Sequence, residues 1–197
     1  MPDTRERWRM QLPHWEVTDR PHFVTIRCAG SLPPHVCQRL DEIRRSLRVI
    51  APSSPEFAQL QRRYFLACEK YLDAGNGFAP FTNPKVAAAL VATLQQLEGG
   101  SRWTVPHFVA MPNHVHLRLK PIGTDSQPLR QTLSQLKGRF ARTANLLLQR
   151  TGDFWQSEWF DHWSRNDAET EHITGYIRQN PVKAGLVRSW EEYPWVR

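Results

Sequence analysis

The stretch Met111–Leu119 constrains the fold more than any other part of the chain. Pro112 and Asn113 suit a tight turn, and the polar residues after them alternate with aliphatic ones, as in a half-buried strand. Because successive side chains of a strand point to opposite faces, His114 and His116 share one face. Two neutral imidazoles so placed could hold one divalent metal ion, although polar side chains facing solvent would give the same alternation.

Composition narrows the class of protein. A chain of 197 residues, 40% of them hydrophobic, can form one domain with a sizeable core. Its net charge of +7 makes a polyanion the first partner to consider. The charged N-terminus lacks a secretory signal, and the longest near-apolar run, 86–94, is too short to span a bilayer. Three cysteines without Cys-x-x-Cys spacing indicate reduced thiols, so we expect a cytoplasmic protein without a zinc-cysteine site.

Hydrophobic periodicity predicts an α+β protein. Its order of elements is typical of a ferredoxin-like antiparallel sheet with helices on one face and a helical insertion after the first strand. We predict a single domain, 1–197, that includes an N-terminal arm (1–20), a helical elaboration (33–98) and a C-terminal tail (182–197). The expected strands are 22–29, 102–110, 114–120 and part of 154–163, and the expected helices are 34–49, 55–72, 85–97, 128–149 and 166–180.

A second informative stretch, Tyr176–Pro181, ends the last predicted helix. Tyr176 and Asn180 are four residues apart and so face the same way on a helix. An amide oxygen suits a hard divalent cation, and a tyrosine beside that cation could act as a nucleophile. The alternative is a core tyrosine and an asparagine that caps the helix, and Pro181 disfavours a helical conformation at Asn180.

The segment between Ser126 and Thr151 carries five basic residues and no acidic one. Arg130 and Lys137 are seven residues apart, so they share one side of the predicted helix and could follow the phosphates of a nucleic acid, while Arg139 lies across from them. A solvated basic face would explain the same pattern.

Several short motifs, taken in their order along the chain, match those of a known family. They are Leu12–Trp15, Phe23–Thr25, Tyr71–Asp73, Met111–His116, Phe154–Gln156 and Tyr176–Val187. With a basic helix between the histidine and tyrosine motifs, the sequence resembles the single-tyrosine transposases of the HUH class, and among them the REP-associated tyrosine transposases.

This resemblance implies a site and a reaction. His114 and His116 would bind a divalent metal, Mg²⁺ or Mn²⁺, with Asn180 as the third ligand, and Tyr176 would be the nucleophile. The enzyme would cut single-stranded DNA near hairpins of REP-like elements, leaving a 5′-phosphotyrosine and a free 3′-hydroxyl that can later rejoin the strands. No nucleotide cofactor would be needed, and we expect a monomer rather than a homodimer.

Two other hypotheses stay open. The same fold could be a catalytically silent regulator that binds hairpin DNA or RNA, or a phosphodiesterase that activates water and uses Tyr176 only structurally. The basic residues predicted to contact DNA are Arg130, Lys137, Arg139, Arg142 and Lys183, and the secondary site candidates are His162 and Arg165.

Overall fold

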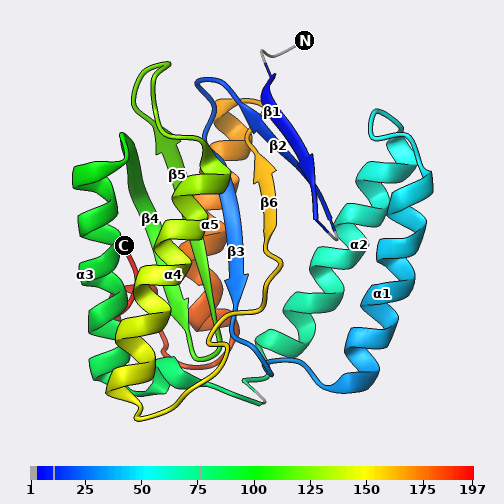
Figure 1. Ribbon diagram of the computed structural model, residues 1–197. Helices are drawn as coiled ribbons and strands as arrows, with labels where there is room; N and C mark the ends of the chain where they lie inside the picture. Colours follow the sequence, from blue (N-terminus) through cyan, green and yellow to red (C-terminus); the bar gives the residue numbers. More distant parts are fainter. Residues whose placement is uncertain (1–3, 11, 76) are drawn as a thin grey trace.

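A computed structural model describes residues 4–10, 12–75 and 77–197, with the backbone alone for Arg7 and Arg9. Its centre is a four-stranded antiparallel sheet with strand order β4-β5-β3-β6, which confirms the ferredoxin-like prediction (Figure 1). The strands of this sheet are β3 (His22–Arg27), β4 (Trp103–Met111), β5 (His114–Pro121) and β6 (Phe160–Trp163). The predicted N-terminal arm, apart from residues 1–3 and 11, which lie outside the described residues, contains a separate hairpin of β1 (Thr4–Arg9) and β2 (Pro13–Val17).

Helices cover both faces of the sheet, not one as expected. The helices α3 (Pro84–Gly100) and α4 (Leu129–Leu147) cover one face, and α5 (Asp167–Lys183) covers the other (Figure 1). The physical reason is that every residue of the central strand β3 is buried, so its two faces both need a cover. One core therefore lies between the sheet and α3 and α4, and a smaller one lies beneath α5.

The helices α1 (Pro34–Val49) and α2 (Pro55–Leu72) form the insertion after the first sheet strand. They pack on each other around a second hydrophobic core and stand beside the β6 side of the sheet (Figure 1). Ser54 caps α2 by accepting a hydrogen bond from the Phe57 backbone. Within the range 33–98, α3 belongs to the main sheet layers, so only α1 and α2 extend the fold sideways.

A buried histidine fixes the N-terminal hairpin to the segment that leads into β6. The His14 ring contacts Glu158 through Nε2 at 2.9 Å and Asp161 through Nδ1. Burial would lower the pKa of His14, but its hydrogen bonds with Asp161 and Glu158 outweigh burial and raise the pKa to about 9. The Trp8 ring stacks on His14 with centroids 5.2 Å apart. The predicted arm is therefore packed against the domain.

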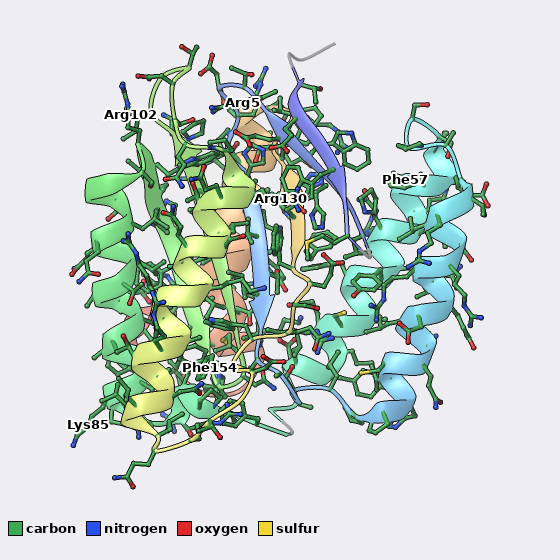
Figure 2. All side chains as sticks on the ribbon, in the orientation of Figure 1. Arg5, Phe57, Lys85, Arg102, Arg130 and Phe154 are labelled. Carbon is green, nitrogen blue, oxygen red and sulfur yellow. The ribbon has the colours of Figure 1, made fainter. Side chains whose placement is uncertain are left out.

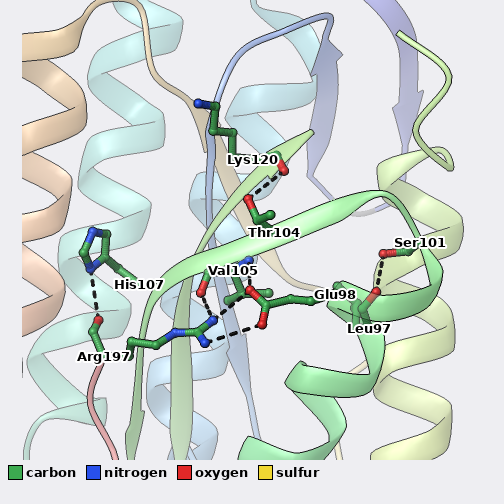
Figure 3. A network of polar contacts seen from close by, with 8 residues as sticks. All are labelled: Leu97, Glu98, Ser101, Thr104, Val105, His107, Lys120 and Arg197. Atoms are coloured by element: carbon green, nitrogen blue, oxygen red, sulfur yellow. Dashed lines mark hydrogen bonds and ion pairs between the residues drawn. The ribbon is translucent and has the colours of Figure 1, made fainter. Parts of the chain in front are cut away.

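The predicted C-terminal tail returns to the outer edge of β4. After η2 (Trp190–Glu192), residues 195–197 run antiparallel to β4, and the backbone nitrogen of Arg197 donates to Phe108 at 2.9 Å. The Arg197 guanidinium donates to Glu98 at 2.9 Å and to the Val105 carbonyl (Figure 3). No helix in the described part of the chain is long and apolar enough to cross a membrane.

Candidate active site

The two histidines of the first motif lie at the start of β5. The register pairs His114 with Arg27 and His116 with Thr25 on β3, so both imidazoles project from one face of the sheet. Both side chains are fully buried, and their Nε2 atoms are 3.0 Å apart. The strand alternation therefore brings the pair together as expected.

Each imidazole is oriented by a hydrogen bond at its other nitrogen. His116 Nδ1 lies 2.8 Å from Thr25 Oγ1, and His114 Nδ1 lies 2.8 Å from Asn113 Oδ1. Such bonds hold a ring and its tautomer in place, leaving Nε2 for a ligand. Both Nε2 atoms consequently meet at one point beneath α5.

Tyr176 reaches the same point from α5. Its ring centroid is 5.3 Å from that of His116 and 5.8 Å from that of Phe23. The buried residues Ile173 and Ile177 anchor this part of the helix on the sheet. The structure thus brings the predicted nucleophile beside the predicted metal ligands.

A third group, Glu69, comes from α2 and was not identified from the sequence. Its Oε2 lies 3.2 Å from His116 Nε2 and accepts a hydrogen bond from the Tyr176 hydroxyl. One ligand atom each of Glu69, His114 and His116 lie within 4.8 Å of one another, and all three residues are buried. The one signal in the sequence is an acidic residue among the core positions Cys68 and Leu72 of an amphipathic helix.

The electrostatics of the site favour a neutral His114, an ionised Glu69 and a protonated Tyr176. Burial, and then the neighbouring His116, lowers the pKa of His114 to about 3. Burial would raise the pKa of Glu69, but the charge and hydrogen bond of His116 outweigh burial and lower it to about 2. Burial, and then the charge and hydrogen bond of Glu69, raise the pKa of Tyr176 far above its ordinary value.

Asn180 is fully buried one turn after Tyr176. Neither Oδ1 nor Nδ2 of its amide reaches a hydrogen-bond partner among the described residues. The sequence predicted that the helix stops before Pro181, and this was wrong: α5 continues to Lys183. Because a proline so near the end of a helix removes few backbone bonds, the last turn tolerates it, and Asn180 stays on the helix face of Tyr176.

These residues fit a divalent metal ion. Two imidazoles and a carboxylate can together bind a first-row divalent cation such as Mn²⁺. The unpartnered amide of Asn180 is a further oxygen donor of the kind that hard cations accept. Glu69 thus joins the predicted ligands His114, His116 and Asn180 as a candidate.

Four of the five basic residues predicted to contact DNA are exposed, and they lie in two separate places. Arg130, Arg139 and Arg142 are exposed on α4, on the face of the sheet opposite α5. Arg130 is labelled in Figure 2. Lys183, at the end of α5, lies near the tyrosine, and its Nζ donates to Asp73 at 2.8 Å. The structure therefore does not bring Lys183 together with the three arginines of α4.

The ammonium group of Lys137 is hydrogen-bonded within the protein. Its Nζ donates to the carbonyl oxygens of Gln156 at 2.9 Å and Ser157 at 2.7 Å, and lies 5.1 Å from the centre of the Trp159 ring. Burial lowers the pKa of Lys137 to about 8. These contacts tie α4 to the segment that leads into β6.

The secondary candidates His162 and Arg165 meet at the other end of α5. Both contact Glu169, which accepts a hydrogen bond from the Arg165 backbone at 2.7 Å and lies 2.8 Å from His162 Nε2. Glu169 precedes Tyr176 by seven residues, which corresponds to about 10 Å along a helix. His162 and Arg165 are therefore separate from the His114–His116 pair.

The chain is similar in sequence to two curated proteins. One, from Haemophilus influenzae, is provisionally named a REP-associated tyrosine transposase and is 28% identical over 95 residues, 43% of this chain and 53% of that protein. The other, the REP-associated tyrosine transposase of Escherichia coli, is 29% identical over 89 residues, 45% of this chain and 50% of that protein. The chain spans about half the length of the curated relatives it matches.

A solved structure shares the fold. It is a REP-associated tyrosine transposase bound to a REP hairpin, with a TM-score of 0.58 and 13% identity, and the match covers 97% of this chain and 81% of the other. No protein-family model matches the chain. The resemblance to REP-associated tyrosine transposases that the motifs indicated is thus found in both sequence and fold.

Proposed function

We infer that this protein is a metal-dependent transposase that nicks and joins single-stranded DNA near hairpins, with Tyr176 as the nucleophile. The observation that carries this inference is the convergence of His114, His116, Glu69 and Tyr176 on one buried point. These residues come from a sheet strand, an inserted helix and the last long helix. A fold that only binds DNA has no need of such a cluster.

The substrate class follows from the protein's relatives and its charge. A fold neighbour is bound to a REP hairpin, and the net charge of +7 suits a polyanion. We therefore assign a REP-like hairpin with an adjoining single strand as the substrate. We expect a cytoplasmic monomer that needs no nucleotide cofactor.

The residues of the chain have distinct tasks in this proposal. His114, His116 and Glu69, with Asn180, would hold Mg²⁺ or Mn²⁺, which when bound polarises a phosphodiester and favours a nearby phenolate. Thr25 and Asn113 orient the imidazoles. Tyr176 attacks phosphorus, so that the downstream fragment of the strand becomes linked to the tyrosine through its 5′-phosphate, and the upstream fragment is released with a free 3′-hydroxyl. Attack by that hydroxyl on the phosphotyrosine rejoins a strand.

A covalent-adduct assay tests this function. The purified protein is incubated with Mn²⁺ or Mg²⁺ and a pool of labelled single-stranded hairpin DNAs, and the products are separated on a denaturing gel. We expect a heat-stable protein–DNA band that needs metal and disappears in Tyr176→Phe. Tyr71→Phe is the matched control, because Tyr71 packs against the separate core of α1 and α2.

The other two hypotheses predict different gels. Tight binding without an adduct for any DNA in the pool would indicate a regulator that binds hairpins. Cleavage that persists in Tyr176→Phe would show that water is the nucleophile and would overturn the tyrosine mechanism.

A further inference from the structure

Lys183 lies beside Tyr176 near the end of α5. It follows Tyr176 by seven residues, so both side chains lie on one face of α5. The Lys183 ammonium is 5.9 Å from the centre of the Tyr176 ring. The charge of this lysine therefore lies close to the predicted nucleophile.

A carboxylate holds Lys183 in the free protein. Asp73 lies four residues after Glu69, so α2 presents two acidic side chains to α5. Glu69 accepts the Tyr176 hydroxyl, and Asp73 accepts the Lys183 ammonium at 2.8 Å. The lysine side chain is 57% exposed, and an ion pair of this kind is weak in water.

The Asp73 carboxylate is only half satisfied. Its Oδ1 is buried and has no hydrogen-bond partner within the described ranges. Because the lysine end of the ion pair is exposed, a phosphate can compete with Asp73 for the Lys183 ammonium. Of the five basic residues predicted to contact DNA, Lys183 is the one on the tyrosine side of the sheet.

We propose that Lys183 binds the scissile phosphate and stabilises the charge that develops on it during cleavage, and that Asp73 holds the ammonium until DNA arrives. This inference rests on the proposed function. In the step concerned, Tyr176 gives its proton to water and its oxygen bonds to phosphorus. The bond from phosphorus to the 3′ oxygen breaks, and that oxygen leaves with the electron pair and takes a proton from water. A lysine acts here as a compact point charge on the phosphoryl oxygens.

The first measurement is the rate of adduct formation in a single turnover at saturating hairpin DNA. Lys183→Met should lower this rate about 100-fold, while DNA affinity falls less than about tenfold because many other phosphates remain bound. Lys183→Arg should recover part of the rate. Lys85→Met, at an exposed position at the start of α3, is the matched control.

The second measurement compares DNA affinities and not reaction rates. The cleavage position is mapped on the wild type, and a hairpin with a neutral methylphosphonate at that position is compared with normal DNA in metal-free binding. The wild type should prefer the charged phosphate, and Lys183→Met should bind both DNAs equally, which is the coupling of a double-mutant cycle. Asp73→Asn should tighten binding, because the ammonium loses its competing partner.

The results distinguish a failure of the proposed transposase function from a failure of the role of Lys183. A wild type that forms no adduct overturns the proposed function, and this inference with it. An active wild type whose Lys183→Met variant keeps its rate, or still discriminates between the two DNAs, overturns the role of Lys183 alone. If Asp73→Asn and Lys183→Met weaken binding and stability alike, the pair is purely structural, and the inference is wrong.

Discussion

The Tyr176 hydroxyl donates a hydrogen bond to Glu69, a residue 107 positions earlier in the chain. The same carboxylate oxygen lies 3.2 Å from His116 Nε2. An inserted helix thus contributes a group that touches both the predicted nucleophile and a predicted metal ligand. The negative charge of Glu69 also helps to keep Tyr176 protonated, because it contributes to the rise of the tyrosine pKa.

Replacing Glu69 with glutamine should weaken metal binding. The substitution keeps the shape of the side chain but removes the charge that attracts a cation, so we expect Mn²⁺ affinity to fall by at least about tenfold. Isothermal titration calorimetry on the DNA-free protein measures the change. Glu56→Gln, at an exposed position in the first turn of α2, provides the control. Unchanged Mn²⁺ affinity in Glu69→Gln would remove Glu69 from the ligand set.

Replacing Asn180 with leucine should separate stability from activity. The buried amide has no hydrogen-bond partner in the described structure, and an unsatisfied buried polar group costs about 1–3 kcal/mol. We therefore expect the metal-free variant to unfold at the same or a higher urea concentration than the wild type, while adduct formation is lost. A clear loss of stability would mean that the amide is hydrogen-bonded in solution.

The contribution of His14 to stability should depend on pH. The pKa of His14 is about 9 in the folded protein and about 6.5 in the unfolded chain. A raised pKa stabilises the fold fully below pH 6.5, and this stabilisation decreases between pH 6.5 and 9 and is lost above pH 9. Its size is about 3 kcal/mol, because one pKa unit corresponds to about 1.4 kcal/mol. Urea unfolding of the wild type and His14→Gln across this range checks the prediction, with exposed His172→Gln as the control. Parallel pH profiles for the wild type and His14→Gln would contradict it.

Lys137 and Arg142 should behave differently although both lie on the basic helix α4. Lys137→Met removes two hydrogen bonds from an ammonium, so we expect a loss of about 2 kcal/mol in the free energy of unfolding. Arg142 is exposed, so Arg142→Ala should leave stability within about 0.5 kcal/mol of the wild type. Chemical denaturation measures both. If Lys137→Met is as stable as Arg142→Ala, the lysine contacts contribute little to the fold.

The histidine pair was predictable because strand alternation is a local rule. His114 and His116 are two residues apart, and any strand through them places both on one face. The helical spacing of Tyr176 and Asn180 is equally local, and the two segments were related through the resemblance of the ordered motifs to the single-tyrosine transposases.

Glu69 could not be predicted in this way. Its position depends on how α2 packs beside the sheet and α5, which no local spacing specifies. Lys137 is a second example of a position that depends on the tertiary fold. Its charge suggested a contact with DNA, but the fold packs it against Trp159. Pro181 shows that a rule about backbone preference gives way where the helix is about to end anyway.

The segment 195–197 has a consequence for how molecules of this protein can associate. A sheet grows by adding a strand to an edge whose backbone groups are free. On β4, backbone groups of Phe108 and Ala110 are already hydrogen-bonded to this segment. The backbone nitrogen of Val105 donates to Glu98, and its carbonyl oxygen accepts from Arg197. A second molecule could extend the sheet there only by first displacing residues 195–197. The other edge of the sheet is the short strand β6, and β2 packs beside it.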